Sequence, residues 1–113
     1  MNVYDEAHRL AKSIKESNEY KEYCEKQKKA FSNEKNKEMI EDFRKKALEI
    51  QMEQLSGNEI SEDKVEKLQK LQDVLMLNPD IKDYFIAEMR FSQLVADIYD
   101  IIEKAVNVEI EEN

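Results

Sequence analysis

The chain contains one glycine and one proline in 113 residues. Tight β-hairpin turns and phosphate-binding loops depend on glycine, and proline interrupts helices, so both types of residue normally punctuate a fold. With so few breakers, the sequence favours long helices that are interrupted mainly at Gly57 and at Asn78-Pro79. Apolar residues recur at intervals of three and four, a pattern that a disordered chain would lack. We therefore predict an all-α fold.

Capping residues divide the sequence into about five helices. Ser17-Asn18 and Ser32-Asn33 are pairs whose side chains favour helix starts, and Pro79 suits the first position of a helix. Gly57 suits the left-handed backbone that commonly follows a helix end. The expected spans are residues 3–16, 19–30, 34–55, 61 to the break at 78, and 79–106.

These helices are expected to form one domain, residues 1–113, because the chain has a common single-domain length. Within it we expect two short helices over 1–32, a helical hairpin over 33–78 and a long carboxyl-terminal helix over 79–106. The hairpin should be antiparallel, since the link from Gly57 to Ser61 is short. A second apolar strip on its first helix, at Leu48, Met52 and Leu55, requires a partner of its own.

The long carboxyl-terminal helix is apolar around roughly two-thirds of its circumference when residues are placed at about 100° intervals. One neighbouring helix covers much less, so we expect this helix to be central to the bundle and also partly buried by a second subunit. The sequence thus predicts an oligomerising helical bundle and a homo-oligomer, most simply a symmetric dimer. The predicted interface residues are Phe91, Leu94, Val95, Ile98, Ile101 and Ile102.

The net charge of −8 is carried by the second half of the chain. Up to Leu55 twelve basic residues balance twelve acidic ones, whereas six basic and fourteen acidic residues follow from Ser56 onward. Direct binding of nucleic acid is not expected, because it needs a clustered basic face. The sequence has no signal-peptide pattern and no apolar run long enough to cross a membrane, and its single cysteine suits a reducing compartment. We expect a cytoplasmic protein with no membrane association.

No catalytic, metal or cofactor site is predicted. His8 is the only histidine and lies on a charged face, and Cys24 has no second histidine to act as its base. Structural zinc needs four Cys or His ligands, and the chain offers two in total. An enzyme is therefore the least favoured class. Two alternatives to an interaction protein remain open, namely a redox or iron–sulfur regulator that uses Cys24 across a dimer and a small-molecule binder with a pocket beside the last helix.

The sequence also resembles the YlbF/YmcA/YheA family of small helical bacterial proteins over nearly its whole length. The residues that carry the resemblance are Tyr4-Asp5, Ala7, Leu10, Ser17, Glu19-Tyr20, Phe43-Arg44, Gln51, Gln54, Gly57, Glu59-Ile60-Ser61, Val65, Ala87-Glu88, Arg90, Leu94 and Ile101-Ile102.

This resemblance implies an all-helical, cytoplasmic non-enzyme of low-GC Gram-positive bacteria that oligomerises through long helices. It further implies regulatory partners of the same family or a ribonuclease Y complex, in which YlbF and YmcA act with YaaT to promote competence, biofilm formation and sporulation. Cysteines near the carboxyl ends of those subunits help to hold iron–sulfur clusters. The tail of this chain, residues 106–113, has no cysteine, and Cys24 lies elsewhere. The chain is therefore more similar to the YheA branch.

Overall fold

The computed structural model describes residues 2–107, which form five α-helices joined by short turns. The all-α prediction is confirmed, and three of the five helices begin and end where the sequence predicts. The helices are α1 Val3–Glu16, α2 Asn18–Phe31, α3 Glu34–Leu55, α4 Glu62–Leu75 and α5 Pro79–Val106.

Side-chain caps explain why the helices start where they do. Asn2 Oδ1 accepts a hydrogen bond from Tyr4 N at 2.8 Å, and Asn33 Oδ1 accepts one from Asn36 N at 3.1 Å. Asn78 Oδ1 accepts two, from the first turn of α5. Each of these bonds satisfies a backbone N–H that has no partner within its helix.

Helix α2 extends one residue beyond the prediction at each end, whereas α4 begins one residue later than predicted and ends at Leu75, before the predicted break at 78. Ser17 alone caps α2, because its Oγ accepts from Tyr20 N at 3.2 Å, so Asn18 is already helical. Ser61 is the N-cap of α4 rather than its first helical residue. Gly57 has φ +77°, which confirms the predicted left-handed turn after α3.

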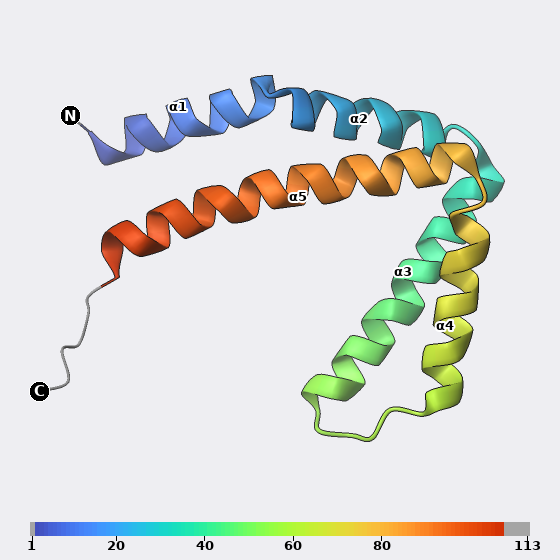
Figure 1. Cartoon of the computed structure of the whole chain (residues 1–113). Helices are drawn as coiled ribbons and strands as arrows, with labels where there is room; N and C mark the ends of the chain where they lie inside the picture. Colours follow the sequence, from blue (N-terminus) through green and yellow to red (C-terminus); the bar gives the residue numbers. More distant parts are fainter. Residues whose placement is uncertain (1, 108–113) are drawn as a thin grey trace, which may run out of the picture.

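The molecule has two thin arms that meet at one end (Figure 1). In the first arm α1 and α2 follow one another, and α5 runs back beside them in the opposite direction. In the second arm α3 and α4 form the predicted antiparallel hairpin, which projects away from α5. The overall extents are 49 × 41 × 18 Å, so the fold is little more than one layer of paired helices thick.

The hydrophobic core lies at the junction of the two arms. Its buried residues come from four helices, so they tie α2, α3, α4 and α5 together at this one place. Aromatic rings from α2 and α5 extend the packing along the first half of α5, where Tyr23 stacks on Tyr84 with ring centroids 5.9 Å apart. The core residues are Ala30, Ile40, Leu75, Ile81 and Tyr84.

The second half of α5 departs from the expected central position. Its first half packs against α2 and the junction, but no residue from Glu88 to Val106 is buried. The hairpin bends away instead of continuing along α5, so α5 is enclosed only near its start. The apolar strip of α3 likewise finds no cover within the described chain, since Leu48, Met52 and Leu55 are all exposed.

A polar contact also joins the two arms at the junction. Asn36, buried in α3, accepts a hydrogen bond at 3.0 Å from Nδ2 of Asn78, the cap of α5. We expect Asn36→Ala to lower the free energy of unfolding by about 1–3 kcal/mol, because the half-buried amide of Asn78 loses its acceptor. Urea unfolding followed by circular dichroism measures the change. Asn58→Ala, in the exposed turn after α3, is the matched control and should change stability by less than about 0.5 kcal/mol.

Candidate interaction surface

An extended apolar surface lies on the second half of α5, where the sequence predicts an interface. Leu94, Val95 and Ile98 are half-buried, while Ile101 and Ile102 are exposed, Ile101 by 68% of its surface. Tyr99 is exposed by 71% on the same half of the helix. Large apolar side chains seldom remain exposed together on a monomer, so this half of α5 is a candidate for contact with another protein.

Phe91, the first residue of the predicted interface, has neighbours within its own chain. Its ring stacks on Tyr23 with centroids 5.2 Å apart and contacts Tyr20 at 5.3 Å. These contacts fasten α5 to α2, so the exposed part of the surface begins at Leu94.

Helix α1 offers a second apolar stripe that the sequence analysis left without a role. The helix is well formed, with a capped start at Asn2, acidic residues in its first turn and Lys15 in its last, yet none of its fourteen residues is buried. Tyr4 is exposed by 78% and Leu10 by 37%. The sequence feature that could have indicated this surface is the amphipathic pattern of residues 3–16, because its apolar side requires a partner.

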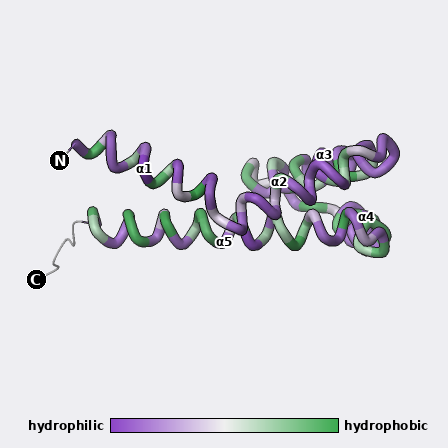
Figure 2. Tube along the Cα trace, turned by 90° about the horizontal axis from the view of Figure 1, so that it is seen from above, coloured by the Kyte–Doolittle hydropathy of each residue, from purple (hydrophilic) through white to green (hydrophobic). Residues whose placement is uncertain are grey.

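The two stripes lie at the same end of the molecule. Helix α1 and the second half of α5 run in opposite directions at this end (Figure 1), and α1 diverges from α5 toward its amino terminus (Figure 2). They therefore leave an open pair of apolar helix surfaces, which we call the terminal apolar face. Its members are Tyr4, Ala7, Leu10, Ala11 and Ile14 of α1 with Leu94, Val95, Ile98, Ile101, Ile102 and Ala105 of α5.

A cavity of about 420 Å³ lies in the elbow between the hairpin and α5. This cavity lies beside α5, where the alternative of a small-molecule binder requires a pocket. Its walls are mainly apolar and include two phenylalanines and two methionines. The lining residues are Phe43, Arg44, Gln72, Met76, Phe85, Ile86, Glu88 and Met89.

The charged groups of the elbow cavity already bind one another. The Arg44 guanidinium is paired with Glu88, donates to the Tyr84 hydroxyl at 3.1 Å and lies 5.9 Å from the centre of the Phe85 ring. Burial opposes the charge of Arg44, but the hydrogen bond and the negative charge of Glu88 outweigh it and raise the pKa of Arg44. Burial raises the pKa of Tyr84 to about 12, although the charge of Arg44 acts against the rise. With these groups mutually satisfied, the cavity offers mainly apolar contact.

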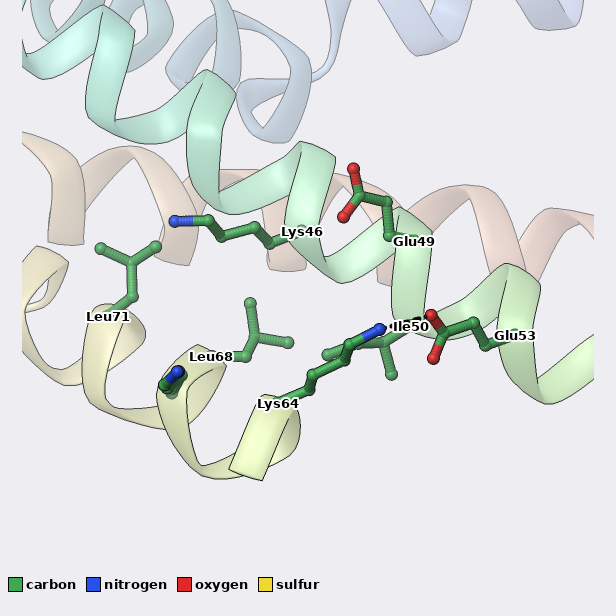
Figure 3. Close-up of a pocket in the computed structure, with 8 residues that line it drawn as sticks. Lys46, Glu49, Ile50, Glu53, Lys64, Leu68 and Leu71 are labelled. Atoms are coloured by element: carbon green, nitrogen blue, oxygen red, sulfur yellow. Dashed lines mark hydrogen bonds and ion pairs between the residues drawn. The ribbon is translucent and has the colours of Figure 1, made fainter. Parts of the chain in front are cut away.

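A smaller groove of about 280 Å³ lies between α3 and α4 (Figure 3). Ile50, Leu68 and Leu71 form its apolar part, and lysine and glutamate side chains surround them. The Lys64 ammonium bridges the two helices by binding Glu53 at 2.7 Å, and this hydrogen bond raises the pKa of Lys64. The residues that line this groove are therefore mainly those that hold α3 and α4 together.

The two residues considered for chemistry lie apart from these cavities. His8 is exposed on α1, and Cys24 is half-buried on α2. Interaction with the neighbouring Cys24 side chain raises the pKa of the Tyr20 hydroxyl. Among residues 2–107, no three His, Cys, Asp or Glu side chains are grouped so that they could hold a metal ion.

None of the helices within residues 2–107 combines the length and the apolar character that crossing a bilayer requires.

Comparison with protein families gives a match that spans nearly the whole chain. A family model described as "Control of competence regulator ComK, YlbF/YmcA" matches residues 3–107. A UPF0342 protein of Caldicellulosiruptor saccharolyticus is 43% identical over 110 residues, which cover 97% of this chain and 92% of that protein. A UPF0342 protein of Symbiobacterium thermophilum is 41% identical over 108 residues and 96% of both chains.

A solved structure has the same fold. It is a protein of unknown function (DUF964) from Bacillus stearothermophilus, which aligns with a TM-score of 0.83 over 92% of this chain and 91% of its own. Because the two sequences are 20% identical, the likeness establishes the all-helical fold and nothing further.

Proposed function

The chain belongs to the YlbF/YmcA family, whose model is described as control of the competence regulator ComK, and from that premise we propose that it is a regulatory adaptor that acts by binding other proteins. Family membership confirms the resemblance seen in the sequence. A regulatory family description is consistent with a protein that is not an enzyme.

The observation that carries the proposal is the terminal apolar face. Seven large apolar side chains on α1 and the second half of α5 are substantially exposed to solvent. Contiguous apolar patches of this kind mark sites of protein contact on monomers. Of the seven, Tyr4, Leu10, Ile101 and Ile102 belong to this face, and Val3, Tyr99 and Val106 lie on the same two helix segments.

We infer that the first partner is a second copy of the chain, bound through the second half of α5. Further partners are regulatory proteins of the same family or a ribonuclease Y complex in the cytoplasm, as the resemblance implies, and the processes regulated are competence, biofilm formation or sporulation. The long apolar stripe supports self-association because a two-fold axis brings the same surface of both copies into one interface. The elbow cavity supplies a separate apolar site.

Ile98→Asp tests this proposal. We expect the native chain to scatter light with about twice the chain mass at micromolar concentration, and the variant to scatter with the mass of one chain. Ile98 lies near the middle of the α5 stripe, and a carboxylate buried there without a partner would cost several kcal/mol. Ile98 is only half-buried within the subunit, so the fold itself should survive, as circular dichroism would report.

Gln93→Asp is the matched control, because it places the same new residue on the exposed polar side of α5 and should leave the mass doubled. In a strain that lacks the gene, the native chain and Gln93→Asp should restore expression of competence genes, and Ile98→Asp should not. A native chain that is monomeric at micromolar concentration would contradict the proposal.

A further inference from the structure

We propose that α1 of one copy packs against the second half of α5 of the other copy, so that the dimer closes as a four-helix bundle built from both α1 and both α5 helices. This inference rests on the self-association proposed above and assigns α1 to the interface. It therefore concerns residues Val3–Glu16, to which the sequence analysis gave no binding role.

The first support is that α1 is a well-formed helix whose apolar side stays uncovered within residues 2–107. A helix of fourteen residues is marginal by itself in water, and most helical stability in proteins comes from packing of an apolar face. Helix α1 has such a face but buries none of its residues, and it diverges from its own α5 (Figure 2). Another apolar surface must cover it.

The second support is that the two stripes match in length and direction. Helix α1 spans about 21 Å, and residues 94–106 of α5 span about 20 Å, at 1.5 Å per residue. They run antiparallel at the same end of the molecule (Figure 1). A two-fold axis perpendicular to both would bring two such open pairs together, with each α1 entering the space that the other copy leaves beside its α5.

Charge decides which helix lies next to α5. Residues 94–106 carry Asp97, Asp100 and Glu103 against a single Lys104, whereas α1 carries three acidic and three basic residues and His8. Two α5 ends packed directly on each other would therefore place two acidic segments in contact.

The positions of the charges sharpen this argument. At about 100° per residue, Lys15 borders one side of the α1 stripe and Glu6 borders the other. Asp97, with Lys104 beside it, and Glu103 border the two sides of the α5 stripe. The Lys15 side of α1 can therefore face a carboxylate of α5, and α1 carries no net charge against the net negative charge of residues 94–106, which favours this neighbour over a second α5.

Leu10→Asp and Ser13→Asp form a matched pair that tests the inference by light scattering. Leu10 lies in the α1 stripe, and Ser13 lies on the polar side of the same helix. We expect Leu10→Asp to raise the dissociation constant of the dimer by about 100-fold or more, because an unpaired carboxylate enters the bundle. Ser13→Asp should change the constant by less than about threefold, since its side chain stays in water.

Cross-linking between copies gives an independent test. In a Cys24→Ser background, one batch carries Leu10→Cys and a second, tagged batch carries Ile102→Cys, so every chain has a single cysteine. After the batches are mixed and treated with a short bismaleimide, we expect a product that joins one tagged and one untagged chain. Replacing the Leu10→Cys batch with Ser13→Cys should abolish this mixed product.

The outcomes separate this inference from the one on which it rests. If Ile98→Asp splits the dimer while Leu10→Asp does not, and no mixed cross-link forms, then α1 lies outside the interface and only this inference fails. If the native chain is a monomer, self-association fails and this inference fails with it.

Discussion

Replacing Tyr84 with alanine is expected to lower the free energy of unfolding by about 3–5 kcal/mol. Tyr84 is the largest fully buried side chain of the described structure. Its ring contacts Tyr23 and Phe31 of α2 at centroid distances of 5.9 and 5.5 Å, and Phe85 at 5.8 Å. Removing the ring leaves a cavity where the two arms meet, and its aromatic neighbours lose their common partner.

Urea unfolding measures this loss, and Met89→Ala provides the control. Met89 lies five residues further along α5 and is exposed, so its truncation should cost less than about 1 kcal/mol. Tyr84→Phe separates the ring from the hydroxyl, because it keeps the packing and removes only the hydrogen bonds of the hydroxyl with Arg44 and Glu88. Equal losses for Tyr84→Ala and Met89→Ala would contradict the placement of the core at the junction.

The second large effect is expected at Ile40, the buried residue that α3 contributes to the core. Ile40→Ala should lower the free energy of unfolding by about 2–5 kcal/mol. Domains of ordinary size are stable by about 5–15 kcal/mol, and only five buried residues form the core cluster of this one. A single cavity at the junction should therefore detach the hairpin from the α2–α5 arm or unfold the chain.

Leu48→Ala on the same helix is the control for Ile40→Ala. Leu48 is 54% exposed, so the same kind of truncation should cost less than about 1 kcal/mol. Thermal unfolding followed by circular dichroism should show a clearly lower midpoint for Ile40→Ala and a nearly native midpoint for Leu48→Ala. A lower midpoint for Leu48→Ala than for Ile40→Ala would contradict this structure, because it would show that α3 is buried on the side of Leu48 and not on the side of Ile40.

Helix positions were predictable because their causes are local. An asparagine or serine side chain caps a helix by reaching a backbone N–H two or three residues away, as Asn33 and Asn78 do. The one-residue difference at α2 arises where two capping residues are adjacent, since Ser17 and Asn18 compete for the same role. Because serine and asparagine have similar capping preferences, the sequence places the start of this helix only to within one residue.

The candidate surface was predictable in part. The broad apolar arc of α5 indicates that one neighbour cannot cover it, and the exposed residues Ile101 and Ile102 agree with that. The sequence did not indicate that Phe91 would be used within the chain or that α1 would remain open. Nor did it indicate the Arg44–Glu88 pair, whose members are 44 residues apart. These features depend on which helices meet.

The sequence by itself determined the number of helices, their starts to within one residue and their amphipathic sides, because capping, turn geometry and periodicity act over a few residues. Only the tertiary structure decided that the hairpin bends away from α5, so that the core gathers at one junction and the far end of the other arm keeps its apolar sides open. The physical reason is that this bend is set by the packing of side chains such as Ile40, Leu75 and Tyr84, which are distant in sequence and whose contact no local pattern encodes.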